Sequence, residues 1–205
     1  DRRKKIVYET GKACAKLLEL DIKPSDILAF DAFENAITML NAVGGSTNGI
    51  LHLLALANEV GIKLTYDDFE RIRKKTPHIA DMKPGGGYVM NSLDKIGGIP
   101  LVMKKLLDNN LIHGNTLTVT GKTIEENIKQ YKISTTEQQI VREVENPLHG
   151  VGTAVILKGT LAPEGAVIKT AGVEMSKFTG KARVFDGEES AFDTVAKGEI
   201  NEGDV

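Results

Sequence analysis

The sequence predicts an α/β chain in which a mainly helical region precedes a β-rich region. Up to about residue 145, apolar residues recur every three or four positions between Lys and Glu, as in amphipathic helices. Beyond it, short runs rich in Val and Ile are separated by Gly and Pro turns, as in strands. Residues 130–150 are polar and are broken by Asn146-Pro147 and His149-Gly150, which is typical of a linker.

Three helices are expected in the first sixty residues. Residues 4–20 have the amphipathic pattern, and residues 24–28 then form a loop and a short turn. A second helix over 33–43 is expected to begin after Asp31. A third helix over 48–59 follows a glycine-rich turn and is apolar on most sides, which predicts that it is buried.

Capping signals and breakers place the next elements. Thr65 followed by Asp68 predicts a helix over 66–74, which Thr76-Pro77 ends. Residues 84–87 (PGGG) form a loop, and Pro100 suits the first turn of a helix over 99–109. Residues 117–119 are expected to form a short strand before another helix that begins at Thr123.

Three strands and one helix are expected after the linker. The strands cover 153–158, 166–170 and 181–185, with turns at Gly159 and 162–165. The helix follows residues 186–190, runs through Val195 and is closed by Gly198.

The composition excludes several classes of protein. The 205 residues carry a net charge of −2, so no general attraction to nucleic acid or to a membrane surface is expected. No apolar run reaches membrane-spanning length and no signal peptide is visible, which favours a cytoplasmic protein. The single cysteine, Cys14, cannot form an internal disulfide or hold a metal cluster by itself. Gly121-Lys122-Thr123 lacks the upstream glycine of a P-loop, because position 116 is Thr.

The most informative motif is Gly44-Gly45-Ser46-Thr47-Asn48. Two glycines permit a sharp turn, and three small polar residues then offer oxygen atoms at the start of a helix. A helix N-terminus with free N–H groups suits a carboxylate or a phosphate. We therefore expect Gly45, Ser46, Thr47 and Asn48 to lie near a substrate, the alternative being an ordinary N-cap whose N–H groups are satisfied by neighbouring loops.

Other polar residues have structural explanations. His52 is expected to be a core histidine or to face a ligand, and His78 to be structural or at a subunit contact. His113 could interact with the negative end of the helix that ends near Asn110. The basic residues of 71–75 are expected to form a solvated helix face. No catalytic or metal-binding residue is assigned from the sequence.

Six stretches, taken in order, resemble the dihydroxy-acid dehydratase and 6-phosphogluconate dehydratase family. They are residues 44–54 (GGSTNGILHLL), 77–90 (PHIADMKPGGGYVM), 97–100 (GGIP), 113–127 (HGNTLTVTGKTIEEN), 155–173 (VILKGTLAPEGAVIKTAGV) and 178–185 (FTGKARVF). The fourth and fifth are most similar to the dihydroxy-acid branch. Asn115 and Gly86 depart from the family pattern, where relatives often carry Asp and Ser.

The resemblance implies a hydro-lyase. Such enzymes remove water from a 2,3-dihydroxy acid to give a 2-keto acid, and the dihydroxy-acid branch serves isoleucine, valine and pantothenate synthesis. The family uses an iron–sulfur cluster and a divalent metal such as Mg²⁺. The resemblance implies that the ligands of both groups, and the catalytic base, lie outside this chain. No cofactor and no activity are therefore expected of these residues alone. A sugar-acid dehydratase of the same family and a non-catalytic assembly module stay open as alternatives.

The resemblance also implies a domain organisation. Residues 1–132 are expected to be the later part of an N-terminal α/β catalytic domain, 133–147 a linker, and 148–205 the incomplete start of a C-terminal β-rich domain of the swivelling type. We expect the chain to be a piece of a longer protein, since it opens without Met and stops at Gly203-Asp204-Val205. The expected partners of the longer protein are a small dihydroxy acid and further copies of itself, as a homodimer or homotetramer.

Overall fold

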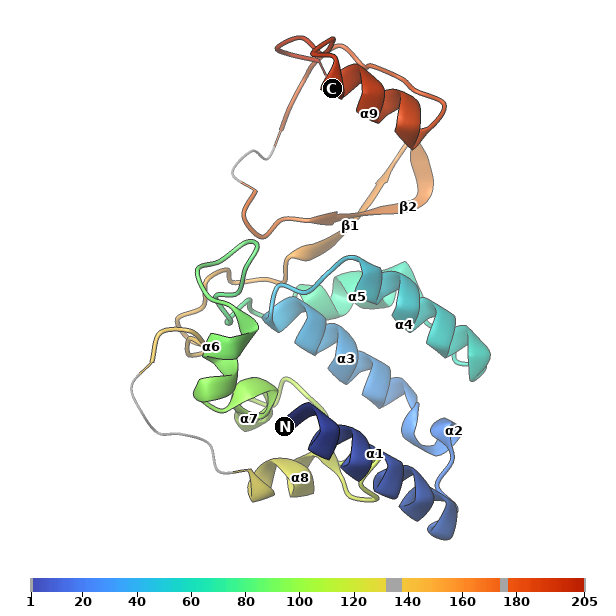
Figure 1. Cartoon of the computed structure of the whole chain (residues 1–205), viewed down its shortest axis with the longest axis vertical. Helices are drawn as coiled ribbons and strands as arrows, with labels where there is room; N and C mark the ends of the chain where they lie inside the picture. Colours follow the sequence, from blue (N-terminus) through green and yellow to red (C-terminus); the bar gives the residue numbers. More distant parts are fainter. Residues whose placement is uncertain (1, 132–137, 174–176, 205) are drawn as a thin grey trace. The chain divides into compact units, whose positions relative to one another are not determined.

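The computed structural model of the chain describes residues 2–131, 138–173 and 177–204 (Figure 1). The chain divides into two compact units, Asp1–Gly172 and Val173–Val205. In chain order the elements of the larger unit are α1 (Arg2–Glu19), α2 (Pro24–Ile27), α3 (Phe30–Ala42), α4 (Asn48–Glu59), α5 (Tyr66–Arg73), α6 (Met90–Lys95), α7 (Gly98–Asp108), α8 (Ile124–Gln130), β1 (Ala154–Gly159) and β2 (Ala162–Lys169). The smaller unit contains α9 (Glu188–Ala196).

The predicted helices are found, most of them within about two residues of their expected bounds. Both predicted capping boxes form, because the N–H of Thr65 donates to Asp68 at 3.0 Å and that of Thr123 to Glu126 at 2.8 Å. The start of α3 was predicted wrongly. The helix begins at Phe30, which places the carboxylate of Asp31 inside the first turn, where the helix dipole favours negative charge.

The sheet is a single antiparallel pair, β1 with β2, in which Ala154 lies opposite Lys169 and Gly159 opposite Ala162. Residues 162–165 were predicted to be a turn but belong to β2, because the reversal is made by the two residues before them. β1 packs against α5, so one side of the pair is covered by a helix.

Two other predicted strands are wrong. Leu117 makes only an isolated bridge to Thr123, because the N–H of Thr118 bonds to the carbonyl of Lys122 at 2.9 Å and closes a tight turn. Lys181 makes only an isolated bridge to Asp204. Within residues 177–204 there is no neighbouring strand for the segment 181–185, and a strand needs a partner for its backbone groups.

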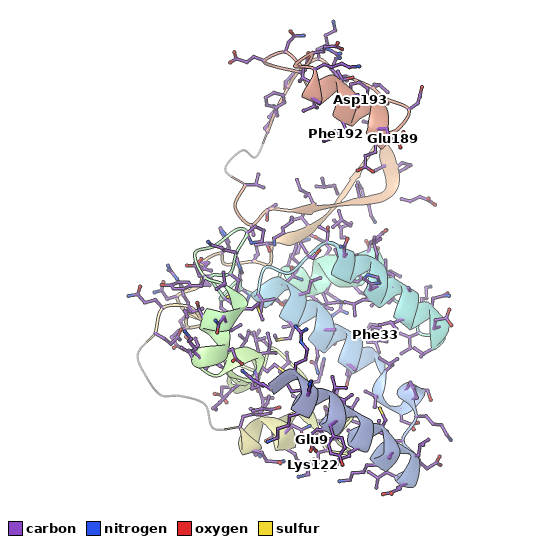
Figure 2. All side chains as sticks on the ribbon, viewed as in Figure 1. Glu9, Phe33, Lys122, Glu189, Phe192 and Asp193 are labelled. Carbon is purple, nitrogen blue, oxygen red and sulfur yellow. The ribbon has the colours of Figure 1, made fainter. Side chains whose placement is uncertain are left out.

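The core of the larger unit has two clusters. One joins α3 to α6, α7 and the segments around residues 80 and 140, and it is made of Ala42, Ile79, Ala80, Met82, Leu93, Leu101, Val102, Leu106, Ile112, Ile140 and Val141. The other joins α3, α4, α5 and β1, and it is made of Ile37, Ile50, Phe69, Ile72 and Ala154. The side chain of Phe33, on α3, is also buried (Figure 2). The chain passes from the first cluster to the second through the turn after Ala42.

The predicted burial of α4 is wrong. Only Ile50 and Ala57 are buried, whereas Leu51 is 59% exposed and Leu56 is 46% exposed. One side of the helix packs on the second cluster, and the opposite side is not covered by the described part of the chain. Helix α1 has no buried residue and presents several apolar side chains to solvent.

The smaller unit has little core of its own. Phe192 and Val195 of α9 are exposed, the former labelled in Figure 2. Arg183 donates to the carbonyl of Glu199 at 3.1 Å and to Asp204 at 3.3 Å, which ties the ends of the unit together.

Helices and a small sheet together agree with the predicted α/β class. The predicted division into residues 1–132, a linker over 133–147 and residues 148–205 stays a prediction. Residues 133–137 of that linker lie outside the described residues, and Ile140 and Val141 are buried in the first cluster. Among the described helices, none has both the length and the apolar character needed to cross a membrane.

Candidate functional site

The turn from Gly44 to Thr47 reverses the chain between α3 and α4. Gly44 has φ +59°, in the left-handed region that glycine adopts without cost. The N–H of Gly45 donates to the carbonyl of Leu40 at 2.7 Å and closes the end of α3. A β-carbon on Gly45 would lie 2.5 Å from Cδ1 of Leu40, so the second glycine lets the turn fold onto that side chain.

The polar residues of the turn do not cap α4 in the predicted way. Thr47 is the N-cap residue, but it has helical backbone angles and its side chain accepts no capping hydrogen bond. The hydroxyl of Ser46 instead accepts from the N–H of Asn48 at 3.3 Å. Within the described part of the chain, the N–H groups of Ser46 and Thr47 have no hydrogen-bond acceptor. Two donors at the positive end of a helix are thus available to a ligand.

A cavity of about 500 Å³ lies against this turn. Its walls come from the turn, the loop that follows Met82, the helices α6 and α7, and the end of β2. The lining residues are Val43, Gly44, Gly45, Ser46, Thr47, Met82, Lys83, Pro84, Met90, Leu93, Ile99 and Lys169. Three of the four predicted substrate-proximal residues therefore line one cavity. Asn48, the fourth, is exposed and is not among the lining residues.

His78 supports the turn from the protein interior. Its side chain is 3% exposed, and its ring stacks on that of His149 with centroids 5.3 Å apart. Burial, together with repulsion from His149, lowers the pKa of His78 to about 4. The ring is therefore neutral at physiological pH.

The loop on the far side of the cavity is held by Asp81. Its carboxylate accepts from the N–H of Gly87 at 2.9 Å, and its carbonyl accepts from the N–H of Tyr88 at 3.0 Å. A β-carbon on Gly86 would lie 2.2 Å from the Asp81 carboxylate, which accounts for glycine at that position. The loop is thereby closed tightly beside Met82, Lys83 and Pro84.

Lys169 belongs to the same cavity, although the sequence did not point to it. Its Nζ donates to the carbonyl of Gly44 at 2.6 Å, across 125 residues of sequence. Sequence spacing carries no signal for this contact, since it depends on how β2 pairs with β1 and on how β1 packs. The alternation of β2, which directs successive side chains to opposite faces, would not by itself have identified the neighbour of Lys169.

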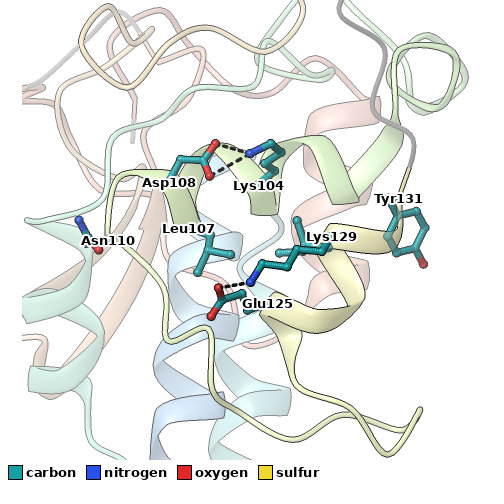
Figure 3. A pocket seen from close by; sticks show the side chains of 8 residues that line it. Lys104, Leu107, Asp108, Asn110, Glu125, Lys129 and Tyr131 are labelled. Carbon is teal, nitrogen blue, oxygen red and sulfur yellow. Dashed lines mark hydrogen bonds and ion pairs between the residues drawn. The ribbon is translucent and has the colours of Figure 1, made fainter.

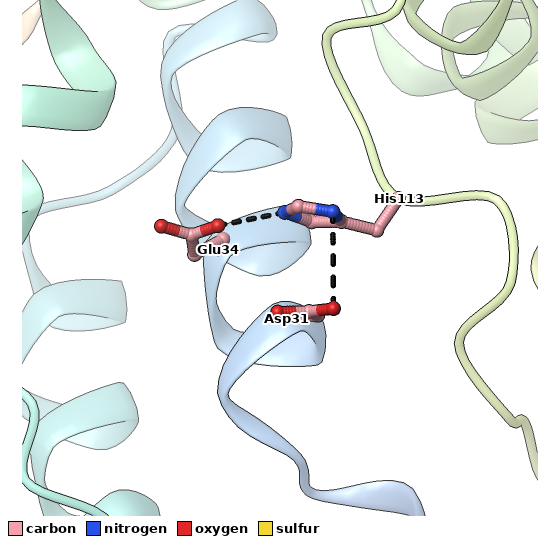
Figure 4. Close-up of side chains that lie close together, drawn as sticks. All are labelled: Asp31, Glu34 and His113. Carbon is pink, nitrogen blue, oxygen red and sulfur yellow. Dashed lines mark hydrogen bonds and ion pairs between the residues drawn. The ribbon is translucent and has the colours of Figure 1, made fainter.

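A second group of polar side chains gathers on α3 and the segment after α7 (Figure 4). Asp31, Glu34 and His113 each offer an atom that could bind a metal ion. His113 Nε2 lies 2.6 Å from Glu34, and its Nδ1 lies 3.9 Å from Asp31. His113 therefore pairs with α3, and not with the end of α7 as predicted.

This cluster is better explained as an ion-pair network. The two carboxylates meet different nitrogen atoms of the ring, and the other oxygen of Glu34 is paired with Arg71 at 2.6 Å. Burial would raise the pKa of Glu34, but hydrogen bonds from Arg71 and His113 outweigh burial and lower it. Asp31 also lies in the first turn of α3, where the helix dipole disfavours a cation.

A further pocket, of about 520 Å³, lies between α7 and α8 (Figure 3). Its charged residues pair with one another, Lys104 with Asp108 at 2.7 Å and Lys129 with Glu125 at 2.7 Å. Both pairs are partly exposed, and within each pair the two charges neutralise each other. This pocket therefore lacks the unpaired charge and the free donors found beside Gly44.

Three other sequence-based expectations concern His52, the basic residues of 71–75 and the segment 121–123. His52 is exposed, so it is not a core histidine. Arg73 does not belong to a solvated face as predicted, because it pairs with Glu70 at 2.5 Å and donates to the carbonyl of Gly152 at 3.2 Å. Gly121-Lys122-Thr123 forms a turn and the N-cap of α8.

The residues of this chain do not fit an iron–sulfur cluster. Such clusters are held by several Cys or His ligands, and the only cysteine, Cys14, is an exposed residue of α1. The ion-pair network on α3 does not fit Mg²⁺, which prefers an octahedral shell of oxygen atoms.

Two family models cover almost the whole chain. The model described as dihydroxy-acid/6-phosphogluconate dehydratase N-terminal matches residues 1–127, and the corresponding C-terminal model matches residues 139–205. The chain belongs to the dihydroxy-acid/6-phosphogluconate dehydratase family. The cavity beside Gly44 thus draws on both matched segments, with Lys169 coming from the second.

The similar curated proteins carry the name of one branch of this family. A dihydroxy-acid dehydratase of Saccharolobus islandicus (strain M.14.25 / Kamchatka #1) is 59% identical over all 205 residues, which cover 37% of its own length. Those of Saccharolobus solfataricus and Sulfolobus acidocaldarius are 58% and 56% identical over the same 205 residues. The chain spans little more than a third of the length of these relatives.

Proposed function

We propose that this chain is part of a dihydroxy-acid dehydratase, and that the turn from Gly44 to Thr47 binds the carboxylate of the substrate. The reaction removes the C3 hydroxyl and the C2 proton of a 2,3-dihydroxy-3-methyl acid as water. The resulting enol becomes the 2-keto acid, a precursor in branched-chain amino acid synthesis.

The observation that carries the proposal is the pair of free donors at the start of α4. The N–H groups of Ser46 and Thr47 have no acceptor in the described residues, and both residues line the cavity. A ligand that displaces water from these donors has to supply acceptors in its place, because a donor left without one costs about 1–3 kcal/mol. A carboxylate supplies two such oxygens and also interacts favourably with the helix dipole.

The walls of the cavity favour a branched-chain acid over a sugar acid. Six of the lining side chains are apolar and come from Val43, Met82, Pro84, Met90, Leu93 and Ile99. A methyl-branched acid can bury its methyl groups against them. A sugar acid would bring additional hydroxyl groups, and each would need a hydrogen-bond partner that these side chains do not offer.

We further propose an iron–sulfur cluster and Mg²⁺ as cofactors of the full-length protein, held by residues outside this chain. The residues described here fit neither group, so no step of the reaction is assigned to them beyond binding and orienting the acid. The cluster ligands, the metal ligands and the base that the family implies are to be sought in the remaining sequence.

We also propose that the full-length protein is a homodimer or homotetramer in the cytoplasm. Support for further contacts comes from the apolar side chains that α1 exposes, since Val7, Tyr8 and Leu18 are 66%, 69% and 84% exposed. Apolar groups gathered on one helix favour a covering surface from another segment or another subunit.

Activity of the full-length protein tests the proposal. The cluster is reconstituted, and keto-acid formation is measured with 2,3-dihydroxyisovalerate, 6-phosphogluconate and a pentonate. The proposal predicts that kcat/KM for dihydroxyisovalerate exceeds the other two values. A preference for a sugar acid would support the other branch of the family. No turnover with any acid, in a protein that holds its cluster, would support a non-catalytic assembly module.

A further inference from the structure

Lys169 is held in place by the core rather than by a mobile loop. It is the last residue of β2 and lies opposite Ala154, a buried residue of β1. The N–H of Ala154 donates to the side chain of Asn41 at 3.2 Å, and Asn41 is itself 1% exposed in α3. The strand end that carries Lys169 is therefore fixed to the helix that leads into the glycine turn.

The ammonium of Lys169 has no acidic partner in residues 2–131, 138–173 and 177–204. An ammonium has three donors, and the carbonyl of Gly44 takes one of them. None of the residues that line the cavity is acidic, and the only other charged lining residue, Lys83, is also basic. A half-buried cation in a positively charged cavity thus retains two donors for a ligand.

We propose that Lys169 binds the carboxylate of the substrate and makes a negative charge at that end of the ligand a condition of binding. The proposal rests on the proposed function and extends it to a residue of the segment 139–205, which the C-terminal family model matches. A carboxylate has two oxygens and about four lone-pair sites, so it can accept from the turn and from Lys169 and still meet a metal ion. Hydrogen bonds between two charged groups are shorter and stronger than neutral ones.

The alternative is a structural role in which Lys169 only fastens the turn through Gly44. Both roles predict that removing the side chain harms binding, so the test has to isolate the charge. Two ligands of nearly the same shape do so: 2-ketoisovalerate, which carries a carboxylate, and its uncharged amide. If Lys169 only holds the turn in place, its removal should weaken binding of the acid and of the amide equally. If Lys169 contacts the negative charge, its removal should weaken binding of the acid alone.

The experiment measures dissociation constants by calorimetry on the full-length protein, for the wild type, three variants of Lys169 and one control variant. Lys169→Met removes the charge and the donor, Lys169→Gln keeps a donor without the charge, and Lys169→Arg keeps the charge. Lys158→Met is the matched control, because Lys158 lies on the paired strand β1 and is exposed. Thermal melting of each variant shows whether it is folded.

We expect Lys169→Met and Lys169→Gln to weaken binding of the keto acid at least tenfold and binding of the amide less than twofold. Lys169→Arg is expected to recover part of the loss, and Lys158→Met to match the wild type. Equal losses for acid and amide, or wild-type binding by Lys169→Gln, would overturn the proposal. If the wild-type protein neither binds nor dehydrates dihydroxyisovalerate, the proposed function itself fails, which is a different result from unchanged binding in the Lys169 variants.

Discussion

The ring of His78 lies directly against Gly44. A β-carbon on Gly44 would be 2.7 Å from Nε2 of that ring, closer than real β-carbons approach other atoms. The ring is buried on the interior side of the turn, and the cavity lies against the turn as well. The shape of the candidate site therefore depends on a glycine at position 44 and on an aromatic ring at position 78.

Gly44→Ala is expected to destabilise the protein by more than its backbone strain alone. A non-glycine residue at positive φ costs about 1–2 kcal/mol, and overpacking against His78 adds about 1–3 kcal/mol. Gly61→Ala is the matched control, since Gly61 has φ +70° and no atom near the added carbon. Denaturant unfolding measures both variants. Equal losses of unfolding free energy would show that His78 does not confine the turn.

Unfolding free energy should depend on pH through His78. The pKa of His78 is about 4 in the folded chain, whereas an unfolded histidine titrates near 6.5. Between these values the unfolded state binds more protons, so stability is complete above about pH 6.5 and is lost as pH falls toward 4. The loss attributed to His78 is roughly 2–3 kcal/mol.

His78→Phe keeps a ring against the turn and removes the titration. Chemical unfolding between pH 7 and pH 4 should show a smaller decline for this variant than for the wild type. His52→Gln, at an exposed histidine, is the control substitution. If His78→Phe follows the same pH curve as the wild type, the low pKa of His78 has no part in acid stability.

Much of the local structure was predictable, because it depends on neighbours in sequence. The capping pairs Thr65 with Asp68 and Thr123 with Glu126 span one helical turn, and both form. The strand expected over 181–185 is wrong because a strand depends on a partner that local sequence does not reveal. The burial of α4 was overestimated for the same reason. An apolar helix favours contact with another segment, but its sequence does not show whether such a segment lies beside it.

The candidate site was only half predictable. The motif of two glycines and three polar residues indicated the turn, and three of its residues do line a cavity. The hydrogen bond from Lys169 and the packing of His78 join segments that are distant in sequence, so no spacing rule could indicate them. The pairing of His113 with Glu34 was missed in the same way.

The isolated chain is expected to bind no iron–sulfur cluster. Cys14 offers one thiolate, whereas such clusters need several ligands. After reconstitution with iron and sulfide, the measured iron should stay well below one atom per chain, and Cys14→Ser should give the same value. A stoichiometric cluster with visible charge-transfer bands would refute this expectation.

Limited proteolysis is expected to cut the chain first between residues 130 and 150. This prediction follows from the expected domain boundary, and the segment 35–60 should resist cleavage because Ile37 and Ile50 are fully buried. Mass spectrometry of the earliest fragments identifies the cut. A first cut inside residues 35–60 would contradict the proposed boundary.

The most direct test of the account is a pair of substitutions at Thr47 in the full-length protein. Thr47→Val keeps the shape of the side chain and removes its hydroxyl, whereas Thr47→Ser keeps the hydroxyl. If the Thr47 side chain joins the backbone N–H groups of the turn in contacting the substrate, Thr47→Val should lower kcat/KM for dihydroxyisovalerate by the equivalent of about 1–3 kcal/mol, with thermal stability little changed and with Thr47→Ser near the wild type. Unchanged kcat/KM together with a lower melting temperature in Thr47→Val would show that the Thr47 hydroxyl only stabilises the turn, and would contradict its contact with the substrate.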